Sequence, residues 1–145
     1  MAYAAITDQP IDIGKLEESV RSHGFGGYVT FSGNVRDNAR GKKVLALSYD
    51  SYRPLAQKQM LEIAEEVERK WGGSCAIAHR IGPIPMGESS VAIVVGTAHR
   101  AEAFEACRWA IDTLKETVPI WKRETYEDGE VWIEGDAAVP AQGRS

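Results

Sequence analysis

Two lysines near the end of the chain have a residue type and a spacing that could support catalysis. Lys115 falls in the last turn of a predicted helix, and Lys122 begins a predicted strand seven residues later. Pro119 ends the helix between them, so helical spacing does not separate the two ammonium groups and they can converge. Converging ammonium groups lower each other's pKa and can act as acid, base or nucleophile. Taken alone, the residues favour a simpler interpretation, in which Lys115 stabilises a helix C-terminus and Lys122 is an exposed strand charge.

Other cationic residues also fall at the ends of predicted elements. His99 and Arg100 stand where an apolar strand gives way to a helix. Free N–H groups and the positive end of the helix dipole favour an anion at such a place, and Arg100 can add a bidentate contact. The alternative is that His99 caps the helix locally while Arg100 is solvated. Asn34-Val35-Arg36 follows a strand end, where Arg36 is either a second anion contact or a surface arginine in a turn.

The two cysteines are poorly placed for chemistry. Cys75 and Cys107 lie far apart and lack companion residues at metal-ligand spacing, so neither a metal site nor, in a reducing compartment, a disulfide is expected. Cys107 falls on the apolar side of a predicted helix, which favours a buried structural thiol. His79, on a predicted strand with no helix start behind it, is likewise interpreted as structural. The sequence shows no sulfur nucleophile of its own.

Composition sets the class of protein. The chain has 145 residues and a net charge of −4, from 17 basic and 21 acidic residues, which argues against general nucleic-acid binding. Its longest apolar runs are too short to span a bilayer. The first ten residues contain neither a basic nor an apolar segment of a secretory signal, so a cytoplasmic protein is expected. The length fits one domain, with a core of about residues 11–134.

Hydrophobic periodicity predicts the elements that must position these side chains. Three helices are expected, after Asp12, from Pro54 to about Trp71, and from about Ala101 to Thr117, the last with Phe104 facing inward. The order of helices and strand pairs predicts an α+β domain with a mainly antiparallel sheet. The polar segment 38–43 is predicted as a mobile loop and residues 135–145 as a frayed tail. The expected strands are 27–32, with Val29 and Phe31 on its buried face, 44–49, 75–81 and 90–98, followed by a hairpin over 121–134.

Several motifs, in their order along the chain, resemble the large catalytic subunit of molybdopterin synthase, the MoaE family. The resemblance covers roughly Ile11 to Glu134, and its most specific part is a PIWK segment that follows an HRxxAF segment. The matching runs are FSGNVRD at 31–37, YDSY at 49–52, HRIG at 79–82 with Gly87-Glu88, HRAEAFEAC at 99–107, Lys115, and VPIWKRE at 118–124.

The resemblance implies an α/β hammerhead-like fold and an enzyme that works with a partner. The family forms a homodimer in which each protomer holds one small ubiquitin-like subunit, a heterotetramer in all. The partner's C-terminal Gly-Gly thiocarboxylate enters a pocket and delivers sulfur to cyclic pyranopterin monophosphate. Two rounds give the dithiolene of molybdopterin. No cofactor and no metal are implied, and the poor placement of the cysteines is explained because the sulfur arrives on another chain.

The resemblance also implies roles for individual residues. Lys115 and Lys122 would be the catalytic pair, with Lys115 meeting the partner's terminal carbonyl and Lys122 assisting proton transfer or holding substrate. Arg36 would serve its own or the neighbouring protomer's site. Two alternatives stay open: a non-catalytic anion- or nucleotide-binding regulatory module, and a purely structural subunit. The residues expected to line the pterin and cyclic-phosphate site are Asn34, Val35, Arg36, His99, Arg100, Lys115, Lys122, Arg123 and Glu124.

Overall fold

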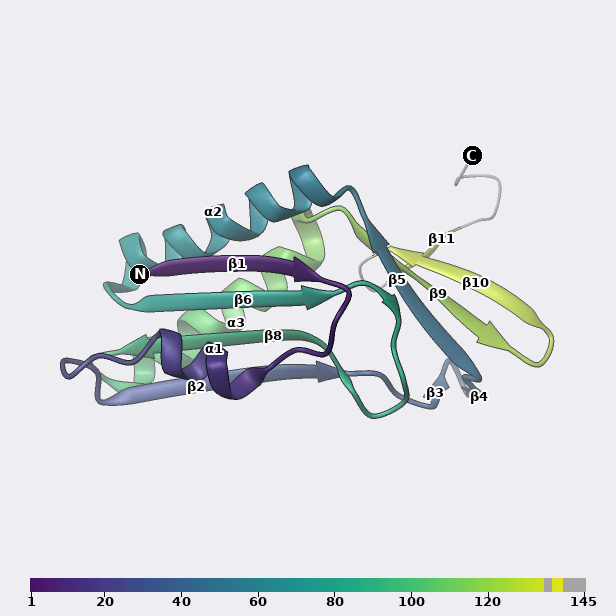
Figure 1. The fold of residues 1–145 in the computed structure, drawn as a ribbon, viewed down its shortest axis with the longest axis horizontal. Helices are drawn as coiled ribbons and strands as arrows, with labels where there is room; N and C mark the ends of the chain where they lie inside the picture. The colour runs from purple at the N-terminus through teal and green to yellow at the C-terminus, as the bar shows by residue number, and fades with distance from the viewer. Residues whose placement is uncertain (135–136, 140–145) are drawn as a thin grey trace.

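A computed structural model describes residues 1–134 and 137–139. Its first sheet has the strand order β1-β6-β8-β2, in which β1 runs parallel to β6 and the other pairs are antiparallel. Helix α1 packs on one face of this sheet, while α2 and α3 cover the other (Figure 1). The elements of this layer are β1 (Ala2–Thr7), α1 (Ile13–Ser19), β2 (Gly27–Asn34), α2 (Arg53–Trp71), β6 (Ser74–Arg80), β8 (Ser89–Thr97) and α3 (Arg100–Thr117).

A second, fully antiparallel sheet lies beyond the ends of β1 and β6 (Figure 1). Its strand order is β11-β10-β9-β5-β7, and β9 pairs with β10 through a tight hairpin. The strands are β5 (Ala46–Ser51), β7 (Gly82–Pro83), β9 (Ile120–Tyr126), β10 (Gly129–Glu134) and β11 (Ala137–Val139), and the separate ribbon is β3 (Asn38–Ala39) with β4 (Lys42–Lys43). The predicted α+β class, the mainly antiparallel pairing and the C-terminal hairpin are confirmed.

The main core lies between the four-stranded sheet and helices α2 and α3. The side chains of Ile77 and Ile93, on the two central strands, are fully buried, as is Met60 of α2. Helix α3 faces them mainly with small residues, which lets its backbone approach the sheet. Because the sheet and α2 hold this helix firmly, the position of its C-terminal turn is fixed, and that turn carries Lys115. The buried residues of α3 are Ala103, Ala106, Cys107, Ala110 and Leu114.

Two side chains predicted to face inward lie outside. Phe104 is 62% exposed, because the face of α3 that packs on the sheet is built from alanines rather than from its aromatic residue. Phe31 is 37% exposed, because β2 is an edge strand. Strand β1 was not predicted at all. Its alanine-rich sequence has low strand propensity, and only its parallel pairing with β6 makes it a strand.

The segment predicted as a mobile loop forms a tight ribbon instead. Arg40 and Gly41 link β3 to β4 with φ values of 53° and 75°. A two-residue hairpin turn of this kind needs positive φ at both central residues, where asparagine or glycine is usual. Because the first position is an arginine, the sequence carries no signal of this turn. The predicted tail 135–145 falls outside the described residues except for the backbone of β11.

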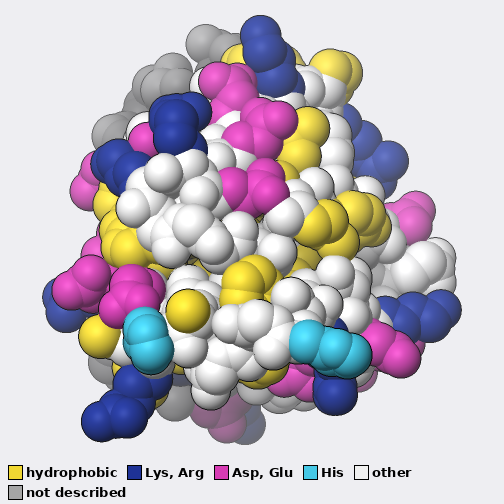
Figure 2. Space-filling model, turned by 90° about the vertical axis from the view of Figure 1, so that its left-hand side faces the viewer, with side chains coloured by type: hydrophobic (Ala, Val, Ile, Leu, Met, Phe, Trp, Pro, Cys, Tyr) yellow, Lys and Arg dark blue, Asp and Glu magenta, His cyan; other side chains and the backbone are white. Residues whose placement is uncertain are grey.

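Surface charge on the part of the chain that the structure describes is mixed. On the face drawn in Figure 2, Lys and Arg side chains alternate with Asp, Glu and hydrophobic ones rather than forming one basic surface. None of the described helices combines the length and apolar character that a membrane crossing requires.

The start of α1 offers a test of local stability. Asp12 is its N-cap, and its side chain accepts a hydrogen bond from the Lys15 backbone N–H at 3.1 Å. Replacing Asp12 by alanine is expected to cost about 1 kcal/mol, since this helical N–H then loses its partner. Urea unfolding would measure the loss, with the exposed Asp8→Ala as the matched control. Equal midpoints for the two variants would contradict the capping role.

Candidate functional site

A small cavity of about 20 Å³ lies where α3 ends and β9 begins. Lys115 and Lys122 both line this cavity. The sequence predicted that they could converge, because Pro119 ends the helix between them. Apolar and aromatic side chains form most of the remaining wall. The lining residues are Tyr49, His79, Leu114, Lys115, Val118, Ile120, Trp121, Lys122 and Ile133.

Lys122 is held at the centre of the second sheet. In the strand registers it stands opposite Tyr49 of β5 on one side and Ile133 of β10 on the other. Its side chain is only 19% exposed, and its Nζ lies 3.3 Å from Oε2 of Glu124. Two neighbouring strands and a carboxylate therefore restrict where this ammonium group can go.

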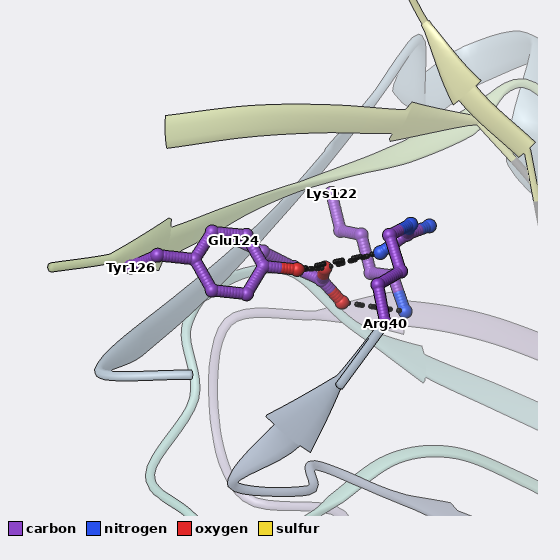
Figure 3. A network of polar contacts seen from close by, with 4 residues as sticks. All are labelled: Arg40, Lys122, Glu124 and Tyr126. Atoms are coloured by element: carbon purple, nitrogen blue, oxygen red, sulfur yellow. Dashed lines mark hydrogen bonds and ion pairs between the residues drawn. The ribbon is translucent and has the colours of Figure 1, made fainter. Parts of the chain in front are cut away.

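Glu124 is the buried hub of a polar network (Figure 3). Its Oε1 accepts hydrogen bonds from Arg40 Nη1 at 2.7 Å and from the Tyr126 hydroxyl, while its Oε2 pairs with Lys122. The residue is 3% exposed. Burial, with the hydrogen bond to Glu124 second, raises the pKa of Tyr126, so this hydroxyl keeps its proton and remains a donor at neutral pH.

Lys115 approaches the same cavity from the last turn of α3. The turn is closed by the Val118 N–H, which donates to the Leu114 carbonyl at 3.0 Å, and Pro119 prevents any continuation. A cation is favoured at the C-terminal end of a helix. The arrangement therefore places a partly buried positive charge beside the cavity.

His79 forms the wall next to Lys115. Its ring packs edge-on against Tyr49, with the ring centres 5.0 Å apart, and its Nδ1 lies 2.9 Å from the Arg80 carbonyl. Burial lowers the pKa of His79 to about 4, and the positive charge of Lys115 acts in the same direction. At neutral pH the ring is uncharged. A buried position agrees with the structural interpretation of His79, but the ring also borders the lysine cavity.

The proposed anion contacts on α3 lie elsewhere in the protomer. His99 is the N-cap of α3, without a side-chain capping bond, and Arg100 is the first residue of the helix; both are exposed. Fifteen residues separate Arg100 from Lys115, which at 1.5 Å per residue is about 22 Å along the helix. One copy of the chain does not bring these two groups together.

The remaining predicted site residues are also dispersed. Asn34, the last residue of β2, and Arg36, two residues later, are exposed, whereas the side chain of Val35 is buried against Leu47 and Ile84. Arg123 points away from Lys122 and Glu124, because neighbouring residues of a strand face opposite sides of the sheet.

Arg123 has its own partners on that side. Its Nε lies 3.3 Å from Glu130, and its guanidinium lies 5.8 Å from the centre of the Trp132 ring. Of the nine predicted residues, Lys115 and Lys122 thus line one cavity, and Glu124 is connected to it through its ion pair with Lys122.

Neither cysteine can supply a thiolate. Cys75 and Cys107 are both buried. Burial raises the pKa of Cys75 far above the ordinary thiol range and that of Cys107 to about 11. The described residues also contain no cluster of three or more side chains suited to hold a metal ion.

Some residues of the site were missed by sequence reasoning. Tyr126 could have been found, because the alternation of β9 places it on the same face as Lys122 and Glu124. Tyr49 lies in the YDSY motif but was assigned no role. Arg40 carried no signal, since its contact with Glu124 joins positions 84 residues apart.

Comparison with known proteins places the chain in a family. The sequence profile of the MoaE protein family matches residues 6–117. Two relatives named molybdopterin synthase catalytic subunit are similar: one from Pyrococcus abyssi, 46% identical with 95% of each chain covered, and one from Bacillus subtilis, 43% identical with 88% of this chain and 82% of the relative covered. A crystal structure of molybdopterin synthase from Staphylococcus aureus matches with a TM-score of 0.84 at 39% identity, covering 88% of this chain and 94% of that one. The chain therefore belongs to the MoaE family.

Proposed function

We propose that this chain is the catalytic subunit of a molybdopterin synthase, a sulfurtransferase that makes the dithiolene of molybdopterin from cyclic pyranopterin monophosphate. The observation that carries the proposal is that Lys115 and Lys122 line one cavity while both cysteines are buried and protonated. The site offers fixed positive charge without a thiolate of its own. Such a site suits a reaction in which sulfur is delivered by another molecule.

The sulfur donor would be the C-terminal thiocarboxylate of a small ubiquitin-like partner. The last two residues of this tail are glycines, which have no side chains. Their backbone can therefore enter a narrow cavity that would exclude bulkier residues. The terminal thiocarboxylate carries a negative charge. The Lys115 ammonium group would contact the carbonyl oxygen of this thiocarboxylate. Fixed cations that face a developing negative charge in a partly buried site stabilise the transition state.

Lys122 would handle a proton or hold the pterin substrate. Its ammonium group lies between the cavity and the Glu124 carboxylate, so its position is set before substrate arrives. Preorganisation of this kind lowers the cost of reaching the reactive geometry. We assign catalytic roles to Lys115 and Lys122 on this basis.

The cyclic phosphate would need further cations, and a second copy of the chain would supply them. His99 and Arg100 at the helix N-terminus form a suitable anion site, about 22 Å along the helix from the protomer's own Lys115. In the proposed homodimer these residues, with Arg36, would complete the site of a neighbouring protomer. Two catalytic and two small subunits would form a cytoplasmic heterotetramer.

Reconstitution tests the proposal directly. The purified chain would be mixed with the small partner bearing a C-terminal thiocarboxylate and with cyclic pyranopterin monophosphate, and product would be measured as the dithiolene. We expect turnover with the thiocarboxylate and none with the same partner ending in an ordinary carboxylate. Tight pterin binding without turnover in the presence of the thiocarboxylated partner would favour the alternative, a regulatory anion-binding module.

A further inference from the structure

We propose that Arg40, at the tip of the β3–β4 ribbon, is a positioning residue that acts through Glu124 to hold Lys122 in its working place. The inference rests on the proposed function, because it concerns how one lysine of that site is held. It extends that function to a residue far away in the sequence, in a segment that carries none of the family motifs quoted above.

The carboxylate of Glu124 is shared between two cations. Oε1 accepts the Arg40 hydrogen bond at 2.7 Å, and Oε2 lies 3.3 Å from Lys122 Nζ (Figure 3). The Tyr126 hydroxyl donates to Oε1 as well, and Arg40 Nη1 lies 3.4 Å from that hydroxyl oxygen. Arg40 therefore fixes one oxygen, and the orientation of the carboxylate then fixes the other oxygen toward Lys122.

The burial of Glu124 makes the sharing of its carboxylate between Arg40 and Lys122 important. The Glu124 side chain is 4% exposed, and a buried carboxylate that loses one of its cationic partners depends more strongly on the other. Without Arg40, Lys122 would be the one cation left on this carboxylate within the described network. We expect the Lys122 ammonium to be drawn closer to Glu124 and away from the cavity, which leaves the substrate with a poorly placed group.

The ribbon itself is attached to the sheet at a second point. Lys42 pairs with Asp128 at 2.7 Å, in the turn between β9 and β10, and both side chains are largely exposed. This ion pair holds the ribbon without contacting Glu124, although Lys42 Nζ also lies 5.7 Å from the centre of the Tyr126 ring. It therefore tests attachment of the ribbon apart from the Arg40–Glu124 hydrogen bond. If Arg40 only fastened the ribbon, loss of Lys42 would have the same consequence as loss of Arg40.

Steady-state kinetics of the reconstituted enzyme provide the test. Arg40→Ala is expected to lower kcat about tenfold, the scale of a charge-assisted hydrogen bond reduced by partial exposure, while KM for the partner and for the pterin changes less than twofold. Arg40→Lys, which keeps a cation near Oε1, is expected to recover most of kcat. Lys43→Ala, at an exposed position of the same ribbon, is the matched control and should retain full activity. Lys42→Ala should lose much less activity than Arg40→Ala.

A double-mutant cycle shows whether Arg40 acts through Glu124. In a Glu124→Gln background, Arg40→Ala should cause little further loss of kcat, because the group it positions is already changed. Three results would each overturn the inference while leaving the proposed function standing. The first is a double variant whose fold loss of kcat equals the product of the two single losses. The others are a loss of kcat in Lys42→Ala equal to that in Arg40→Ala, and an unchanged kcat in Arg40→Ala. A wild-type chain that yields no product with the thiocarboxylated partner would instead overturn the proposed function, and this inference with it.

Discussion

Replacing Lys115 by alanine is expected to reduce sulfur transfer by about a thousandfold, the scale seen when a positioned acid, base or electrostatic group is removed. The loss would come from the rate of the chemical step rather than from folding, because Lys115 is only partly buried and the hydrophobic residues of α3 are unchanged. Single-turnover formation of the dithiolene, with enzyme and loaded partner in excess over pterin, measures the step directly.

Two further variants separate charge from proton chemistry at this position. Lys115→Arg keeps the positive charge but cannot release a proton near neutral pH, so partial activity would indicate an electrostatic role and full loss a role in proton transfer or covalent chemistry. Arg108→Ala removes an exposed cation from the same helix and should react at the wild-type rate. Unchanged single-turnover product in Lys115→Ala, with partner binding and melting temperature intact, would refute the catalytic assignment.

The lysine pair was predictable because its signal is local. The helix must end at Pro119 and a strand follows at once, so the two lysines lie on either side of one helix-to-strand turn. Sequence alone could not show that a cavity lies at this turn. That depends on Tyr49 and His79, which arrive from β5 and β6 and are brought there by strand pairing across the whole domain.

What escaped prediction has long-range causes. Arg40 contributes through a turn with positive φ and a contact 84 residues away, and neither follows from residue type or periodicity. The exposed side chain of Phe104 was wrongly placed because hydrophobicity marked the aromatic residue, whereas close packing selected Ala103, Ala106 and Ala110 for the buried face. The separation of His99 and Arg100 from the lysines follows from helix length alone. In the proposed homodimer, a second copy of the chain would bring them to the lysines of the neighbouring protomer.

Acidification is expected to destabilise the protein through His79. The pKa of this ring is lowered from 6.5 to about 4, chiefly because burial disfavours the charged form. Between these values the unfolded chain binds a proton that the folded chain does not, so stability is complete above about pH 6.5 and is lost as the pH falls toward 4. A shift of this size corresponds to about 3 kcal/mol at the acidic limit. Urea unfolding at pH 7.5, 5.5 and 4.5 would follow the loss.

The comparison that assigns this loss uses the neutral variant His79→Gln, whose stability should change less than that of the wild type, by about 2.5 kcal/mol between pH 7.5 and pH 4.5. His23→Gln, at an exposed histidine, should retain the full wild-type dependence. If His79→Gln does not fold, titration of the His79 ring by NMR in the wild type decides the matter, and a pKa near 6.5 would refute the prediction.

The uncharged state of the His79 ring also bears on the reaction, because a protonated His79 would place another positive charge beside Lys115. A wall that stays uncharged through the physiological range leaves the lysines to set the charge that an incoming thiocarboxylate meets.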